Sequence, residues 1–292
     1  MTTVKQRQVG VLLREWRERR RLSQLQLSLD ADISTRHLSF VETGRSKPTK
    51  EMILRLSERL DVPLRERNSL LLAGGYAPVY PASGLDVPEL AAVRAALRQV
   101  LAGHEPYPAL VVDRAWQLVE SNASVELLLE GAAANLLAPP VNVLRLSLHP
   151  QGVAPNIANL GEWRAHVLGR LRRQAAATAD PALAELLAEL RDYPCDQPEP
   201  EVELPGASDV VVPLRLRHGD RELSLLSMTT VFGTPLDVTV AELAIESFFP
   251  ADRSTADFLR ARAPISREPS TGSDELSTGD FDFNGNRTFD FH

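Results

Sequence analysis

Four side chains between residues 35 and 40 carry groups that can read the edges of DNA base pairs. Arg36 can form two parallel hydrogen bonds with O6 and N7 of guanine, and Phe40 can contact a thymine methyl group. The hydroxyls of Thr35 and Ser39 can hydrogen-bond to several bases. This combination predicts a surface that recognises the major groove.

Polar and cationic residues on either side of this stretch are suited to the DNA backbone. Gln24 stands at the start of a predicted helix, where its side chain and backbone N–H can hold a phosphate. Arg45 and Lys47 follow the stretch and can pair with phosphates. The predicted DNA contacts are Gln24, Ser34, Thr35, Arg36, Ser39, Phe40, Arg45 and Lys47.

Several of these residues also have an ordinary structural explanation. Arg36 could be a solvated surface charge, and Phe40 could pack against the following helix. His37 suits the edge of a core better than a base contact. The prediction therefore depends on the whole group and its spacing rather than on any one member.

Five short helices in the first 75 residues are predicted to position these side chains. The first is indicated by apolar residues at the spacing of one helix face, namely Val9, Leu12, Leu13 and Trp16. Ser23 and Ser34 are suited to cap the next two helices, and Gly44 to end the third in a left-handed conformation. We expect Ser34, Leu38 and Val41 to face inward.

Charge divides the chain into a basic head and an acidic body. Residues 1–80 hold 15 Lys and Arg against 9 Asp and Glu, whereas residues 81–292 hold 17 against 30. The net charges are +6 and −13, and this asymmetry favours a polyanionic partner for the head alone. A simpler interpretation is that two domains of different origin are joined.

The body has a mixed pattern of helices and strands. Helices are predicted at 87–101, 122–129, 161–176 and 181–191, and strands at 108–113, 117–121, 209–217 and 221–231. Residues 235–248 are predicted as a strand end followed by a helix. The predicted fold class is an all-α helix-turn-helix DNA-binding domain followed by an α+β domain with an antiparallel sheet.

The helix predicted at 161–176 carries the body residues best suited to a ligand. Its apolar stripe consists of Trp163, Val167 and Leu171, with His166 and Arg170 beside it. An arginine bordering an apolar face could hold a carboxylate at the mouth of a hydrophobic pocket. The alternative is plain helix packing, with Arg170 extending past its apolar neighbours to solvent.

Trp116 and Asn122 are two further ligand-binding candidates, because they flank the strand predicted at 117–121. Trp116 could equally belong to the core. Asn122 could serve mainly as the N-cap of the following helix.

Residues 22–63, LSQLQLSLDADISTRHLSFVETGRSKPTKEMILRLSERLDVP, resemble the XRE (Cro/C1-type) helix-turn-helix family without a gap. The matching features are Ser23-Gln24, Ile33-Ser34, Leu38-Ser39 and the exit Glu42-x-Gly44-x-x-x-Pro48. Further stretches, PALVVDRAWQLVESNASVELLL and FGTPLDVTVAELAIESFFPAD, look like the MmyB-like regulators. That resemblance implies a PAS-like ligand-binding domain, with fatty acids as the expected ligand class.

Other functions are disfavoured by what the sequence lacks. It has no HExxH or G-x-S-x-G motif, no phosphate-binding glycine loop and no lysine after Lys50, so we expect no enzyme, cofactor or metal. The sequence contains no run of about 18 apolar residues, so no membrane span is predicted. The sequence has one cysteine, Cys195, and its N-terminus does not have the pattern of a secretory signal. We therefore expect a cytoplasmic protein.

The sequence thus predicts a helix-turn-helix domain at 1–80, a PAS-like MmyB-type domain for ligand binding and dimerisation at 85–257, and an acidic disordered tail at 258–292. The predicted partners are a double-stranded DNA operator, a fatty acid or similar apolar molecule, and a second copy of the chain. The alternative is a DNA-binding regulator whose body binds a protein partner and no small ligand.

Overall fold

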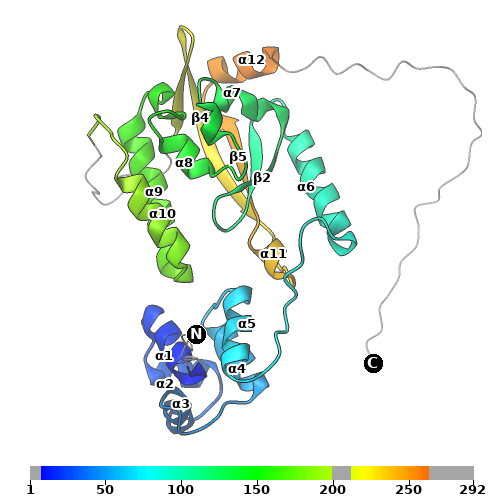
Figure 1. The fold of residues 1–292 in the computed structure, drawn as a ribbon, viewed down its shortest axis with the longest axis vertical. Helices are drawn as coiled ribbons and strands as arrows, with labels where there is room; N and C mark the ends of the chain where they lie inside the picture. The colour runs from blue at the N-terminus through cyan, green and yellow to red at the C-terminus, as the bar shows by residue number, and fades with distance from the viewer. Residues whose placement is uncertain (1–7, 199–211, 263–292) are drawn as a thin grey trace, which may run out of the picture.

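The computed structural model describes residues 8–198 and 212–262, which form a helical head and an α+β body (Figure 1). The head consists of α1 (Val9–Arg19), α2 (Gln24–Asp30), α3 (Thr35–Glu42), α4 (Lys50–Arg59) and α5 (Leu64–Ala73). Ser23, Ser34 and Thr49 each accept, through the side-chain oxygen, a hydrogen bond from the backbone N–H three residues later. These bonds satisfy free donors in the first helical turns and confirm the predicted caps.

Two close contacts fix α1 against α3. A Cβ atom on Gly10 would lie 2.0 Å from the carbonyl oxygen of Val41, so only glycine allows the two helices to approach this closely. Arg17 forks onto Glu42, with Nε–Oε1 and Nη2–Oε2 distances of 2.7 and 2.9 Å. Gly44 follows α3 with a φ of 73°, as predicted for the helix exit.

The body is built on a five-stranded antiparallel sheet in the order β2-β1-β5-β4-β3. Its strands are β1 (Ala109–Val112), β2 (Leu118–Ser121), β3 (Leu214–His218), β4 (Arg221–Val231) and β5 (Ala244–Pro250). Its α-helices are α6 (Ala91–Gly103), α7 (Glu126–Leu129), α8 (Val143–Leu148), α9 (Leu160–Thr178), α10 (Pro181–Arg191), α11 (Val238–Ala241) and α12 (Arg253–Ala261). The helical head and α+β body confirm the predicted fold class, and the curled sheet is consistent with a PAS-like domain.

Helices cover both faces of this sheet. On one face, Leu97 of α6 shares a small core with Val111 and Ile245. On the other, α8, α9 and α10 form a larger core that includes Leu110 and Phe248. Because side chains alternate along a strand, neighbouring residues of β1 and β5 belong to different cores.

The prediction for residues 235–248 was wrong in its order, since α11 comes first and β5 follows. The run VTVAELAIES contains alanine and glutamate, which favour a helix locally. In the fold, however, β5 lies in the sheet between β1 and β4. Ladder hydrogen bonds and the burial of Ile245 and Phe248 override the local preference.

Asn122 does not cap the helix that follows it. Its Oδ1 accepts the backbone N–H of Ala109 at 3.0 Å, and its amide donates to the carbonyl of Tyr107 at 2.8 Å. Glu105 takes the capping role instead, because its carboxylate accepts the backbone N–H of Ala123 at 2.9 Å. Asn122 therefore holds the end of β2 to the loop before β1.

The body continues past the predicted boundary at 257, because α12 extends to Ala261 and buries Leu259. Most of the predicted acidic tail, residues 263–292, and the first part of the strand predicted at 209–217 lie outside the described residues. None of the described helices is long and apolar enough to cross a membrane. Figure 1 shows α5 of the head next to α11 of the body, with α3 at the opposite end of the head.

Candidate functional site

The predicted recognition helix α3 exposes a polar face at the end of the head that lies away from the body (Figure 1). Arg36 is exposed and Ser39 is half-buried on this helix. Leu38 and Val41 are buried, as expected. Ser34 was expected to face inward but is exposed, because its hydroxyl accepts a backbone N–H at the open start of the helix.

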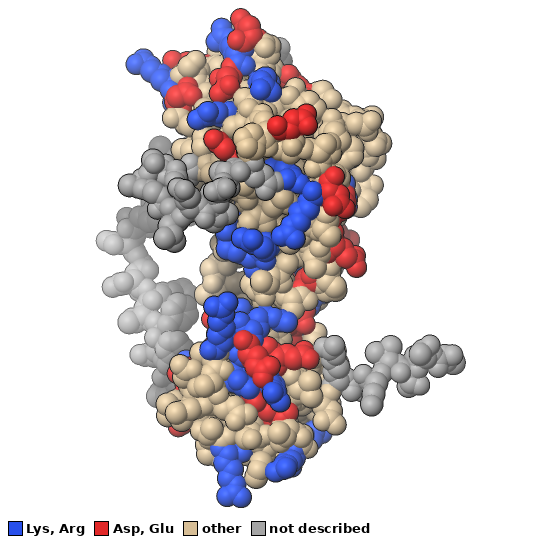
Figure 2. Space-filling model, turned by 90° about the vertical axis from the view of Figure 1, so that its left-hand side faces the viewer, with Lys and Arg blue, Asp and Glu red and all other residues tan. Residues whose placement is uncertain are grey.

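Phe40 is half-buried beneath two guanidinium groups. The central carbon of Arg36 lies 5.4 Å from the Phe40 ring centroid, and that of Arg45 lies 5.9 Å from it. Lys47 is exposed nearby, with its Nζ 5.6 Å from the ring centroid of Tyr76. Cation–π contacts of this kind hold positive charge at the surface, and Figure 2 shows basic side chains projecting from this end of the head.

The side chains of Gln24 and Thr35 form hydrogen bonds within the head. The amide of Gln24 donates to Oε2 of Glu42 at 2.7 Å, which joins it to the buried pair with Arg17. The hydroxyl of Thr35 lies 2.8 Å from that of Ser28. Both side chains are therefore oriented before any DNA arrives.

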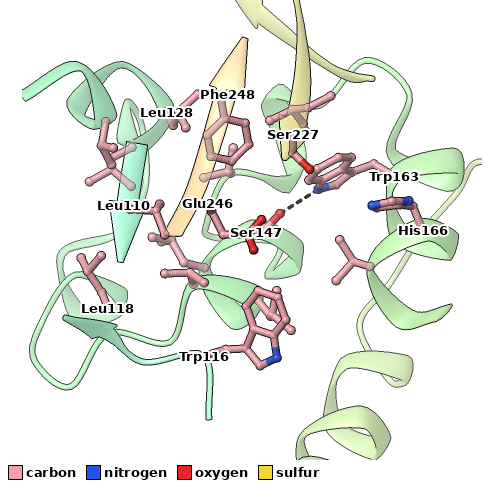
Figure 3. A pocket seen from close by; sticks show the side chains of 18 of the residues that line it. Leu110, Trp116, Leu118, Leu128, Ser147, Trp163, His166, Ser227, Glu246 and Phe248 are labelled. Carbon is pink, nitrogen blue, oxygen red and sulfur yellow. Dashed lines mark hydrogen bonds between the residues drawn. The ribbon is translucent and has the colours of Figure 1, made fainter. Parts of the chain in front are cut away.

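A cavity of about 100 Å³ lies in the larger core of the body (Figure 3). Its lining is mostly apolar and comprises Leu110, Trp116, Leu118, Val125, Leu128, Leu129, Val143, Leu144, Leu146, Val153, Trp163, Val167, Leu214 and Phe248. The polar lining residues are Ser147, His166, Arg170, Ser227 and Glu246. Four of the five predicted ligand residues thus lie together here, whereas Asn122 does not line the cavity.

Arg170 and Glu246 form the charged part of the lining. Nη1 of Arg170 donates to one carboxylate oxygen of Glu246 at 2.9 Å, and Nη2 donates to the other. Thr229 donates its hydroxyl to Glu246 at 2.8 Å. Glu246 is only 5% exposed, so its charge is neutralised inside the protein rather than by water.

Trp116 closes the cavity next to this ion pair. Its backbone has a φ of 64°, an uncommon conformation for a bulky residue, in the turn between β1 and β2. The indole N–H donates to Gln174 at 2.7 Å, and Arg170 lies over the ring at 4.5 Å. Contacts from α9 therefore hold Trp116 in place.

Trp163 and His166 occupy another part of the wall. The indole N–H of Trp163 donates to the hydroxyl of Ser147 at 3.0 Å (Figure 3), and the His166 ring stacks on the indole with centroids 5.4 Å apart. Burial lowers the pKa of His166, and the neighbouring charges of Arg170 and Arg173 lower it further. His166 is therefore neutral at physiological pH.

Glu246 is the functional residue that sequence reasoning missed. Its segment was predicted to be helical, which hid the alternation that places Glu246 on the same face of the sheet as Phe248. The available signal was a single acid inside the apolar run AIESFFP. A charge in such a run is seldom buried without a partner.

A second cavity lies between the body and the head, and Trp116 and Arg170 belong to its lining as well. Here Arg65 of α5 forks onto Glu242, which follows α11, with two N–O distances of 2.7 Å. Burial raises the pKa of Glu66, which also lines this cavity. One wall of the core cavity is thus shared with the junction to the head.

Two family models match the two parts of the chain. The family model of the MmyB-like transcription regulator ligand-binding domain matches residues 93–261, and a helix-turn-helix model matches residues 13–67. A search of the curated proteins finds no match. Among solved structures, the chain is similar to an RNA-binding light-oxygen-voltage receptor, with 13% identity and a TM-score of 0.25 over 87% of this chain. The chain spans 62% of that receptor's length, less than two thirds.

Proposed function

Since the chain belongs to the MmyB-like transcription regulators, which join a DNA-binding head to a ligand-binding domain, we propose that its ligand is a long apolar molecule of the fatty-acid class. The observation that carries this proposal is the core cavity, with its leucine-rich wall and its polar groups gathered around Arg170 and Glu246. An elongated molecule with one polar end matches that distribution.

The size of the cavity limits how such a ligand enters. Ligand pockets commonly measure about 300–1,000 Å³. A cavity of about 100 Å³ must therefore widen to admit a long chain. Each buried CH₂ contributes about 0.8 kcal/mol, which offsets the cost of moving the side chains of α8 and α9.

We infer that the ligand acts on DNA binding through the junction between head and body. Trp116 and Arg170 line both cavities, so a ligand that moves them changes the junction as well. Arg114, in the same turn as Trp116, lies 3.8 Å from Glu242, which holds Arg65 of the head. A ligand that binds one junction geometry better than another shifts the head between positions.

We also propose that the chain acts as a homodimer in the cytoplasm. It regulates by binding DNA and ligand and does not catalyse a reaction. One helix-turn-helix module contacts a single half-site, and a second copy doubles the contacts with the operator.

The test combines native mass spectrometry of the purified full chain with thermal unfolding of delipidated protein. We expect an acyl compound to co-purify with the chain. Added fatty acids should raise the melting temperature and change the operator affinity. If neither fatty acids nor the matching methyl esters and alcohols, from short to long chains, change the melting temperature, the ligand proposal fails. The alternative would then hold, in which the body binds a protein partner and no small ligand.

A further inference from the structure

We propose that Glu246 makes the core cavity select a ligand whose head group is uncharged when bound. Long-chain alcohols, esters and amides, or a fatty acid that keeps its proton, belong to this class. The inference rests on the proposed function of the cavity and defines its ligand more narrowly.

The charges around the head-group site are balanced. From α9, Arg170 and the neutral His166 face it, and β5 contributes Glu246. The remaining polar lining groups are the hydroxyls of Ser147 from α8 and Ser227 from β4. Among the described residues that line the cavity, Arg170 and Glu246 are the two that carry a charge, and they already neutralise each other.

Both terminal nitrogens of Arg170 are already engaged within the protein. Both terminal nitrogens of Arg170 donate to Glu246, and Nη2 also donates to Thr229. An arginine binds a carboxylate strongly when it donates two parallel hydrogen bonds to that carboxylate. In this protein Glu246 occupies the position that the ligand's carboxylate would need.

A ligand carboxylate would meet an unfavourable environment in this cavity. If it entered beside the pair, it would lie next to the buried negative charge of Glu246, and like charges at close range disfavour ionisation. If it drew Arg170 away, Glu246 would remain 5% exposed without its counter-charge. Leaving one member of a buried pair alone is strongly unfavourable.

The same groups are suited to an uncharged head group. The carboxylate of Glu246 can accept a hydrogen bond from a hydroxyl or amide, and Figure 3 shows the oxygens of Ser147 and Ser227 on the same side of the cavity. A serine hydroxyl can donate to an ester or amide carbonyl. These bonds leave the ion pair intact.

The experiment measures dissociation constants of the delipidated full chain for 1-dodecanol, methyl laurate and laurate at about pH 8, where a free carboxylic acid is ionised. For the wild type we expect the alcohol and the ester to bind at least about tenfold more tightly than laurate, a difference of about 1.4 kcal/mol. Glu246→Gln should reverse this order, because Arg170 is then free for the carboxylate. Glu120→Gln is the matched control, since Glu120 pairs with Arg98 at 2.7 Å outside the cavity and its removal should leave the order unchanged.

A second variant covers the case in which Glu246→Gln does not fold. Arg170→Gln combined with Glu246→Gln removes both charges and should keep the preference for the alcohol and the ester. The inference is overturned if the wild type binds laurate as tightly as dodecanol, or if either variant gives the opposite order. If none of the three compounds binds the wild type, the proposed function of the cavity fails, and this inference fails with it.

Discussion

Arg36 is the predicted base-reading residue, and its neighbours on α3 determine how its charge is presented. Its side chain is exposed on α3 and lies over the half-buried ring of Phe40, which Arg45 also approaches. The ring gives two cations a common support, so their charges are held at the surface of the head rather than dispersed in solvent.

Replacing Arg36 by alanine should therefore lower operator affinity by about 1–3 kcal/mol and relax specificity at one base pair. Lys47→Ala should instead weaken binding to all sequences and reduce the slope of affinity against salt by about one unit. Selection from random DNA, followed by titration at several salt concentrations, separates the two effects. Unchanged specificity in Arg36→Ala would show that α3 does not read the bases through this residue.

The buried pair of Arg17 and Glu42 makes a stability prediction. The Glu42 side chain is only 1% exposed, so Glu42→Gln leaves the buried Arg17 charge without the carboxylate that it hydrogen-bonds, and with the more exposed Glu18, 3.7 Å away, as a weaker counter-charge. The free energy of unfolding should fall by about 3–5 kcal/mol, measured by urea denaturation.

The pair of Arg14 and Glu18 is the control for that prediction, because its N–O distance is also 2.7 Å but both side chains are more than half exposed. Arg14→Gln, which breaks this exposed pair and leaves Glu18 in place beside Arg17, should cost less than about 1 kcal/mol. Equal losses in the two variants would mean that burial does not determine the contribution of such pairs here.

Between elements, ion pairs join helices that lie far apart in the sequence. Arg145 of α8 forks onto Glu189 of α10 with N–O distances of 2.6 and 2.7 Å, and Tyr193 donates to the same carboxylate. The hydrogen bonds from Arg145 and then Tyr193 lower the pKa of Glu189 to about 2. The cavity wall formed by α8 is thereby anchored to the outer helix.

This lowered pKa predicts a dependence of stability on pH. Because the folded state favours the Glu189 carboxylate, its contribution is present above the unfolded pKa of about 4.3 and is lost as the pH falls towards 2. Both side chains are 37% exposed, so solvent screening keeps the contribution below about 1 kcal/mol. Glu189→Gln should be less stable than the wild type at neutral pH, and the difference should close in acid.

Chemical denaturation across this pH range checks the expectation. Glu185→Gln, an exposed position on the same helix, is the control and should change stability little at any pH. A Glu189→Gln deficit that persists unchanged to about pH 2 would contradict a role for the charge.

The ion pair between Arg65 of α5 and Glu242 after α11 leads to a prediction about how ligand binding affects DNA binding. Glu242→Gln removes the negative charge and one of the two oxygens that accept from Arg65, but changes neither α3 nor the core cavity. Operator and ligand should each bind as before, whereas the effect of ligand on operator affinity should shrink several-fold. Titrating operator with and without saturating ligand measures that coupling, and an unchanged ratio would show that the signal takes another route.

For the whole molecule, the division into a basic head and an acidic body has a consequence for assembly. The head has its own core, centred on residues such as Leu27, Leu38 and Ile53. A fragment of residues 1–80 should therefore fold alone. It should bind DNA more weakly than the full chain, because it lacks the dimer contacts that we propose for the body, and its affinity should fall steeply with salt.

Sedimentation and gel-shift assays of the fragment and the full chain test this expectation together. The fragment should sediment as a monomer and the full chain as a dimer. A fragment that dimerises and binds as tightly as the full chain would place the dimer contact in the head.

The sequence by itself determined what depends on neighbouring residues. Capping by Ser23 and Ser34, the left-handed exit at Gly44 and the apolar stripes are local features, so they predict the five helices and the recognition face. Trp163 and Arg170 share one side of one helix, which is why their approach to a common cavity was predictable.

Only the tertiary structure decided what depends on pairing between distant segments. β5 forms because β1 and β4 lie on either side of it, although its local composition favours a helix. That pairing carries Glu246 to Arg170, 76 residues away in the sequence, and converts the predicted carboxylate anchor into a neutralised pair. Local spacing contains no information on which strand will lie opposite another, so the charge of the cavity could be read only from the fold.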